Sequence, residues 1–532
     1  MKADLVLIDC NVLTMNPSQS HAEAVAIKAE KIVKVGTIKQ VKQFVGKETK
    51  VIELNGSTIV PGLIDTHIHI ADFGRFLTWI DLNSVKSIKE MQVVIKKNSE
   101  ELPRNKWILG WGWNQINFVE NRMPNNQDID EVSLDHPVIL YHQSGCMCLV
   151  NSKALHLAKI TSQKEAPKGG TIDYNPKNGE PTGILHENAM SLIWNLIPEP
   201  NQKEFFDSAS IACRKVVEAG VTSVHWIVSS VSEIQLIQQL SSENKLPMRV
   251  YVIYPVDILE KLSTLGLMKD SDANWLHIGG IKIFVDGSLA ERTAALKEPY
   301  NDDSNTKGKL FYTQEELKTL VTRLHKANFP VIIHAMGDQA LDMTVTILEK
   351  ILNEYPKKDH RYRIEQAAVL NKDLIKRIKR LGVSVGVQPC TIISEFTAWS
   401  AVARLGEERA RLLYPLKTLL KECIPVIGGS DCPMELVNPF LGIKAAVTRH
   451  FFPKEQIAVG DALRMYTVNA AYASFDENLK GTIDEGKLAD LTVISCDPTT
   501  ILPSQLDDIQ VEMTIIGGKI VYSKEKFLVY ST

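Results

Sequence analysis

Two histidines separated by one residue follow the first strong strand signal of the chain. His67 and His69 end the run PGLIDTHIH at residues 61–69. Alternate side chains of an extended segment point to the same side, so the two imidazoles can share one ion. A His-x-His pair alone is weak evidence. Its place at a strand end, behind Pro61 and Gly62, makes it a candidate metal site.

A lysine interrupts an otherwise apolar strand signal. Lys282 lies in IKIFV at residues 281–285. Burial of an amine costs several kcal/mol unless the amine is paired, neutralised or chemically modified. One solution is reaction with carbon dioxide, because the resulting carbamate is an anion that can bridge metal ions.

Two further strand ends carry residues of metal-ligand type. His334 ends the strand in VIIHAMGD, and Asp431 follows the strand in VIGGSDCP. Taken singly, each of these residues has a structural explanation: a histidine could be part of the core, Lys282 could be a paired buried lysine, and Asp431 could cap a loop. Their joint occurrence at strand ends favours a metal site built from His67, His69, Lys282, His334 and Asp431.

The middle of the chain alternates predicted strands with amphipathic helical patterns. The strands are expected at 58–64, 221–225, 249–254, 281–285, 330–334, 362–366, 383–388 and 425–427. Helices are expected between most of them, for example at 205–219, 314–327, 372–381 and 409–421. Strand then helix, repeated eight times, predicts an α/β fold with a (β/α)₈ TIM barrel. In such barrels the C-terminal ends of the strands carry the chemistry.

The remaining segments predict two additions to the barrel. Short β-rich segments at 1–60 and 475–532, with Gly517-Gly518 at a hairpin turn, predict one small β-sandwich domain made from both chain ends. The barrel domain then spans 61–474. Its first two strands are too far apart for a βα connection, so residues 85–200 are expected to form an inserted subdomain.

The composition is that of a soluble globular protein with a sizeable core. The 532 residues are 44% hydrophobic and 23% charged, and 60 basic against 63 acidic residues give a net charge of −3. This balance argues against a nucleic-acid or anionic-membrane surface. Eight cysteines without framework spacing, and the lack of a signal-peptide or membrane-span pattern, predict a reduced cytoplasmic protein.

Several segments resemble the amidohydrolase superfamily of metal-dependent hydrolases, in particular its YtcJ-like group, which includes N-substituted formamide deformylase. They are PGLIDTHIH, IKIFVDGSLAERTAAL, VIIHAMGDQA, GGSDCP and GKLADLTVI, and the likeness covers nearly the whole chain. The resemblance implies a metal site of His67, His69, Lys282 as a carbamate, His334 and Asp431. It also implies a small-molecule substrate and, by analogy, a homodimer.

The sequence departs from this group at Gln366, where its members usually carry another metal-ligating histidine. A glutamine amide oxygen is a poor ligand for zinc. We therefore predict one firmly held divalent metal ion, with any second ion weakly bound. Zinc is expected, with iron and manganese as alternatives.

Other residues are candidates for contact with the substrate. Cys146 stands where members of the group often have a histidine, and Trp113 could roof the pocket above an apolar group. Both could instead belong to the core of the inserted subdomain, which is the commoner role for such residues. Cys146 could also be a substitute metal ligand. His225 ends the second predicted strand near the barrel mouth. The full set of substrate candidates is Cys146, His225, Trp113, Asp286, Arg292 and Gln366.

These ligands predict hydrolysis by a metal-activated water. A bound metal ion lowers the pKa of water from 15.7 towards about 7, and Asp431 can take a proton and later deliver one to a departing nitrogen. The predicted reaction is cleavage of a non-peptide carbon–nitrogen bond in an amide or N-substituted formamide. A deaminase of a cyclic amidine would suit the same ligands. From another class, a binding protein that has lost part of its metal site stays open.

Overall fold

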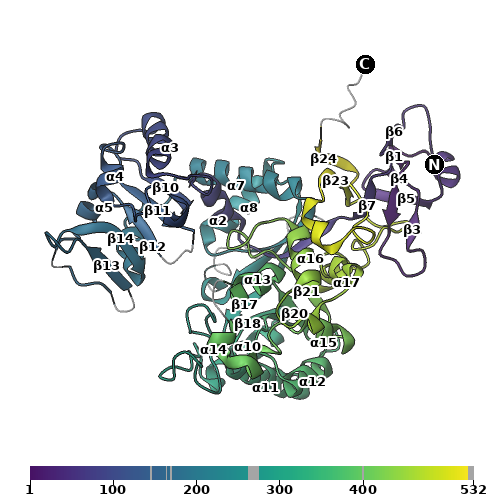
Figure 1. The fold of residues 1–532 in the computed structure, drawn as a ribbon. Helices are drawn as coiled ribbons and strands as arrows, with labels where there is room; N and C mark the ends of the chain where they lie inside the picture. The colour runs from purple at the N-terminus through teal and green to yellow at the C-terminus, as the bar shows by residue number, and fades with distance from the viewer. Residues whose placement is uncertain are drawn as a thin grey trace. The chain divides into compact units, whose positions relative to one another are not determined.

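The computed structural model describes residues 1–143, 147–162, 164–167, 170–259, 261, 275–397 and 401–524 (Figure 1). The chain divides into two compact units. The first consists of Met1–Phe73 and Ala209–Thr532, and the second of Gly74–Ser208. In the described parts of the chain, no helix is both long and apolar enough to cross a membrane.

An eight-stranded parallel sheet forms the centre of the first unit. In spatial order its strands are β8 (Leu63–Ile68), β15 (Val221–Ile227), β16 (Arg249–Pro255), β17 (Leu276–Phe284), β18 (Val331–Ala335), β19 (Arg363–Gln366), β20 (Ser384–Val387) and β21 (Val426–Gly428). This is also their order in the sequence. A parallel bridge between Ile68 and Cys432 joins the two edges. The predicted (β/α)₈ barrel is thus confirmed.

Helices follow most of the strands and lie outside them, as Figure 1 shows for β17, β18 and β20. They are α7 (Gln202–Glu218), α8 (Val231–Ser242), α10 (Gln314–Lys326), α11 (Asp338–Glu354), α12 (Lys372–Leu381), α13 (Pro389–Thr397), α14 (Ala401–Ala410), α15 (Leu416–Lys421), α16 (Pro439–Thr448), α17 (Val459–Met465) and α18 (Val468–Ala473). The strands between them are buried on both faces, which explains their nearly continuous apolar sequences.

Two predicted elements are each divided in the structure. The expected strand at 58–64 is wrong as one element, because β7 (Thr58–Pro61) pairs with β22 (Leu491–Ile494) in another sheet and the barrel strand begins at Leu63. Gly62 lies between them, where an added Cβ would come within 2.2 Å of Thr222 Oγ1. The expected helix at 409–421 is likewise α14 and α15, since Pro415 begins a new helix.

Strands from both chain ends share one sheet. Its order is β24 (Lys519–Ser523), β23 (Val511–Ile516), β22, β7, β2 (Asn11–Leu13) and β3 (His21–Ala22). A four-stranded sheet of β5 (Lys31–Gly36), β4 (Ala24–Lys28), β1 (Leu5–Ile8) and β6 (Lys50–Glu53) contributes to the same buried apolar cluster. This arrangement supports a domain built from both termini, and its boundaries at 60 and 475 stay a prediction.

The second unit has its own sheet and core. The strand order is β13 (Gly170–Tyr174), β14 (Pro181–Glu187), β12 (Met147–Val150), β11 (Val138–His142), β10 (Ile108–Trp113) and β9 (Ile80–Asp81). Helix α3 (Ile88–Glu101) contributes Ile88, Met91 and Ile95 to its main apolar cluster. The long segment between the first two barrel strands is therefore a compact unit, and the predicted limits 85–200 stay a prediction.

Candidate active site

Three polar side chains converge where the first and last barrel strands end. His67 lies in β8, His69 follows β8, and Asp431 follows β21. The Nε2 atoms of both histidines lie 3.4 Å from Asp431 Oδ1. One ligand atom from each residue lies within 4.8 Å of the other two. Two imidazoles and a carboxylate at this spacing can coordinate a divalent metal ion.

Main-chain contacts fix this group. The backbone N–H of Asp431 donates to the carbonyl oxygen of His67 at 2.7 Å, and the N–H of His69 donates to that of Cys432 at 3.0 Å. Asp431 adopts a φ of +59°, which turns the chain sharply after β21. A Cβ on Gly429 would lie 2.6 Å from the His67 backbone nitrogen, so a side chain there would push the two strands apart.

The second ring nitrogen of His67 meets a buried carboxylate. His67 Nδ1 lies 2.5 Å from Glu365 Oε2, and Arg363 Nε donates to Glu365 Oε1 at 2.6 Å. Burial alone would raise the pKa of Glu365, but the charge of Arg363 and the hydrogen bond from His67 outweigh it and hold that pKa well below its ordinary value. An ionised carboxylate only accepts, so His67 Nδ1 carries the proton and Nε2 keeps its lone pair for a metal.

Glu365 and Arg363 were not predicted as site residues from the sequence. They alternate on β19 and both are buried, at 0% and 1% exposure. Two opposite charges at alternate positions of an apolar strand were the available signal, because such side chains share one face. The alternation predicts that both charged side chains point into the barrel, but it does not predict which residues they contact there.

Lys282 is a buried amine in need of an anionic partner. Its side chain is 1% exposed, and its Nζ has no hydrogen-bond partner among the described residues. Burial lowers its pKa to about 8, against the opposing charges of Glu365 and Asp431. Burial lowers the pKa of His67, and the positive charge of Lys282 lowers it further, which places Lys282 electrostatically within the group. An unsatisfied buried amine beside converging ligands fits a modified lysine at a metal centre.

His334 points its Nε2 at a carbonyl group. It lies in β18 and donates from Nε2 to the Gly287 carbonyl oxygen at 3.1 Å. Its pKa is lowered to about 4 by burial and by the charge of Lys282. The ring is therefore neutral at physiological pH, with its lone pair on Nδ1. Nδ1 is the atom through which His334 can bind a metal ion.

The side-chain amide of Gln366 forms a hydrogen bond with a tyrosine. Its Oε1 accepts a hydrogen bond from the Tyr414 hydroxyl at 3.2 Å, and its backbone has a φ of +68°. The two residues come from the end of β19 and from the segment before α15. The amide oxygen thus has one hydrogen-bond donor in this structure, and its weakness as a metal ligand stays a prediction.

Comparison with known proteins identifies the family. The model of the Amidohydrolase family matches residues 50–522. This chain belongs to the amidohydrolase family. The amidohydrolase YtcJ of Bacillus subtilis is 32% identical to it over 529 residues, which cover 96% of this chain and 98% of that protein. The N-substituted formamide deformylase of Arthrobacter pascens is 27% identical over 542 residues, with 98% of both chains covered.

Solved structures of similar proteins agree with this assignment. An uncharacterised metal-dependent hydrolase from Pyrococcus furiosus has a TM-score of 0.77 and 29% identity, over 93% of this chain and 100% of that one. The resemblance drawn from the sequence motifs is therefore confirmed.

Two of the predicted substrate residues make contacts of other kinds in this chain. The Asp286 side chain is fully buried and accepts from the backbone N–H groups of Ala295, Met336 and Gly337. Arg292 forms an ion pair with Asp302 at 2.9 Å. These contacts organise the segment after β17, and a contact with substrate stays a prediction for both residues.

The other predicted substrate residues lie in different surroundings. His225 is buried in β15, with Nδ1 2.8 Å from Arg363 Nη1. Trp113 is fully buried in the second unit, where its Nε1 donates to the Leu140 carbonyl oxygen. This favours a core role for Trp113. Cys146 lies outside the described residues.

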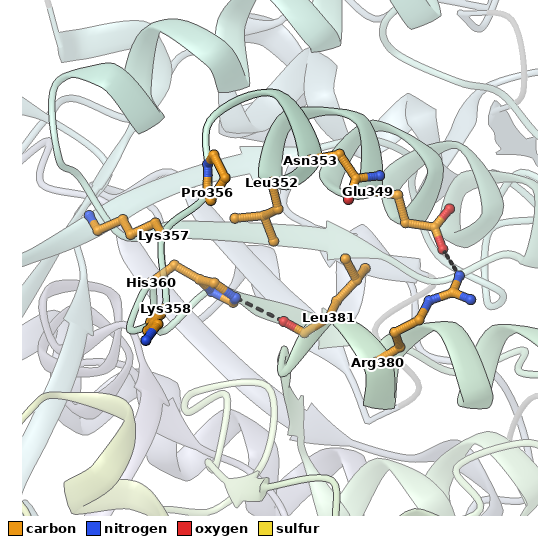
Figure 2. A pocket seen from close by; sticks show the side chains of 9 residues that line it. All are labelled: Glu349, Leu352, Asn353, Pro356, Lys357, Lys358, His360, Arg380 and Leu381. Atoms are coloured by element: carbon orange, nitrogen blue, oxygen red, sulfur yellow. Dashed lines mark hydrogen bonds and ion pairs between the residues drawn. The ribbon is translucent and has the colours of Figure 1, made fainter.

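One cavity of the amidohydrolase lies far from these strand ends. It measures about 550 Å³ and is lined by residues 349–358 at the end of α11, by His360 and by the end of α12 (Figure 2). His360 Nε2 donates to the Leu381 carbonyl oxygen at 2.9 Å, and Arg380 pairs with Glu349 at 2.6 Å. These segments precede β19 and β20, so the cavity lies at the end of the barrel opposite Asp431.

Proposed function

We propose that this chain hydrolyses a non-peptide carbon–nitrogen bond in a small molecule, an amide or an N-substituted formamide. The convergence of His67, His69 and Asp431, together with a buried Lys282 amine that has no hydrogen-bond partner among the described residues, carries this proposal. The similarity to an N-substituted formamide deformylase over 98% of both chains supports the choice of bond.

The proposed metal ligands are His67 and His69 through Nε2 and Asp431 through its carboxylate. Lys282, as a carbamate, and His334 complete the set. Zinc suits this mixture of imidazole and carboxylate, and iron and manganese accept the same donors. With Gln366 in place of a histidine, one ion is held firmly and a second only weakly.

Carbamate formation on Lys282 requires the neutral amine. Nζ attacks the carbon of CO₂, a nitrogen–carbon bond forms, and one proton leaves to solvent. With a pKa of about 8, a substantial fraction of Lys282 is neutral near physiological pH. The product exchanges a buried cation for an anion among metal ligands, which removes the electrostatic penalty on Lys282.

The residues of the chain then have separate tasks in the reaction. A divalent metal ion supplies Lewis acidity, which lowers the pKa of water and polarises a carbonyl oxygen. The Asp431 carboxylate accepts a proton from the attacking water and returns it to the leaving nitrogen as the carbon–nitrogen bond breaks. Burial would raise the pKa of Asp431, but the charges of His67 and His69 lower it, so Asp431 is ready as a base.

We place this reaction in the cytoplasm. The seven described cysteines are all free, as expected in a reducing compartment. A small-molecule substrate follows from the family, and a homodimer stays a prediction.

The test combines metal analysis with two substrate panels. Protein purified without chelators is assayed for metal per chain, then offered N-substituted formamides and amides with detection of released amine, and cyclic amidines with detection of ammonia. We expect about one metal ion per chain and amine release. Failure to bind zinc, iron or manganese, or ammonia release alone, would overturn the proposal.

A further inference from the structure

We propose that Glu365 and Arg363 are positioning residues, which hold His67 in the ring orientation and tautomer that a metal ion requires. The inference rests on the proposed metal centre. Neither residue is expected to touch the metal or the substrate.

The contact between Glu365 and His67 crosses the barrel. β19 is separated from β8 by β20 and β21 on one side and by four strands on the other. Glu365 Oε2 nonetheless lies 2.5 Å from His67 Nδ1. A hydrogen bond to Nδ1 from across the interior limits rotation of the imidazole ring about the Cβ–Cγ bond, so the ring plane is fixed as well as the main chain.

Arg363 fixes the carboxylate in turn. Its Nε donates to Glu365 Oε1 at 2.6 Å, and its Nη2 donates to the Thr66 carbonyl oxygen at 2.8 Å. Its Nη1 donates to His225 Nδ1 at 2.8 Å. One guanidinium thus joins three strands, β8, β15 and β19. Lysine cannot reproduce these contacts, since it lacks the planar fork of donors.

The donor pattern determines the His67 tautomer. The guanidinium only donates, so both Glu365 and His225 accept from it. The Gln388 amide nitrogen lies 3.3 Å from Glu365 Oε2 and 2.9 Å from His67 Nδ1, and the shorter 2.5 Å contact of Nδ1 with the carboxylate decides where the ring proton lies. A carboxylate surrounded by donors accepts from His67 Nδ1–H as well. The lone pair of His67 is then on Nε2, the atom that lies 3.4 Å from Asp431 Oδ1.

Stability does not account for this buried pair. Replacement of a buried ion pair by apolar residues of similar volume is often neutral or stabilising. A role in the orientation of a metal ligand explains why the charges are inside the barrel. Removal of such a supporting partner typically weakens metal binding by about 10- to 100-fold.

The test compares three variants for zinc affinity, measured by competition with a chromophoric chelator. Glu365→Gln keeps the shape but cannot accept from both Arg363 and His67, and Glu365→Asp keeps the charge but is one methylene too short. We expect both to raise the zinc Kd by about 10- to 100-fold. Glu233→Gln is the matched control. Glu233 lies on helix α8 and is also a buried carboxylate, and it accepts a hydrogen bond from Trp226 Nε1 at 2.6 Å. Its zinc Kd is expected to equal that of the wild type.

A second readout uses metal-free protein. Histidine labelled with ¹⁵N reports the ring tautomer by NMR, and the His67 signals are assigned by their loss in His67→Asn. We expect an Nδ1–H tautomer in the wild type and in Glu233→Gln, and its loss in Glu365→Gln.

The outcomes separate this inference from the proposed function. Unchanged zinc affinity in Glu365→Gln, full affinity in Glu365→Asp, or an Nε2–H tautomer in the wild type would each overturn the positioning role. Wild-type protein that binds no metal but retains the Glu365-dependent Nδ1–H tautomer would overturn the proposed function and support the fixed orientation of His67.

Discussion

The backbone N–H of Asp431 donates to the carbonyl oxygen of His67 at 2.7 Å. This bond connects the end of the last barrel strand to the end of the first. The proposed base and a proposed metal ligand are therefore fixed to each other through the main chain. Substitution of either side chain leaves this connection intact, so conservative variants at the site are expected to fold.

Asp431→Asn is expected to abolish most of the activity. The amide has the same shape but cannot take a proton from water, and loss of a general acid–base group typically lowers kcat by about 10²- to 10⁴-fold. The measurement is kcat and metal per chain on the substrate found by the panel. Asp207→Asn, on the exposed face of α7, is the control and should retain full activity. A small change in kcat for Asp431→Asn would exclude Asp431 as the base.

Lys282→Met is expected to change stability and metal content in opposite directions. Methionine fills a similar volume without an amine, so the metal-free protein should gain on the order of a few kcal/mol in its free energy of unfolding. Metal per chain should fall, because a ligand is lost. Urea unfolding of chelator-treated protein and elemental analysis check the two effects. A less stable metal-free variant would show that Lys282 is satisfied in the folded state.

The pH dependence of stability provides a separate test of Lys282. Its folded pKa is about 8, whereas the ordinary value is 10.5. Below the folded-state pKa, Lys282 is protonated in both the folded and the unfolded state, so burial of its positive charge destabilises the folded state in full. Between the two values the unfolded state binds more protons, so stability rises with pH.

Urea unfolding of wild type and Lys282→Met at about pH 7 and about pH 10, in buffer free of CO₂, checks this. The stability difference between them should shrink at the higher pH. A constant difference would contradict the lowered pKa.

Gln366→His is expected to raise the metal content from about one towards about two ions per chain. Imidazole is a better zinc ligand than an amide oxygen, and histidine tolerates a positive φ such as the +68° at this position. Elemental analysis after zinc reconstitution and desalting measures the change. Gln366→Asn is the control, since its amide is equally weak as a ligand. An unchanged stoichiometry would mean that the absent histidine is not what limits a second site.

The barrel and part of its site were predictable from local patterns. Alternating strand and helix signals located seven of the eight barrel strands and the start of the other, and ligand types at their ends pointed to His67, His69 and Asp431, which the structure brings together. His334 was located at the correct strand end, but the direction of its Nε2 toward Gly287 depends on the loop after β17. Local sequence carries no information on that loop.

The missed features depend on contacts between distant segments. The strand at 58–64 reads as continuous, yet Gly62 divides it between two sheets because Thr58–Pro61 pairs with residues near the C-terminus. Glu365 and Arg363 could not be assigned a role from the sequence, because nothing in the local pattern of β19 indicates their partners. Their function depends on His67, which lies 298 residues away from Glu365, and no periodicity reports such a pairing.

The sheet shared by the two chain ends has a consequence for biosynthesis. β7 pairs with β22, which places Thr492 beside Val60 although Thr492 is synthesised far later. During translation β2, β3 and β7 are made long before β22. The edge of β7 that pairs with β22 therefore stays unpaired until almost the whole chain has left the ribosome. A nascent chain stalled before residue 491 would therefore display an open β edge directly before the strand that bears His67.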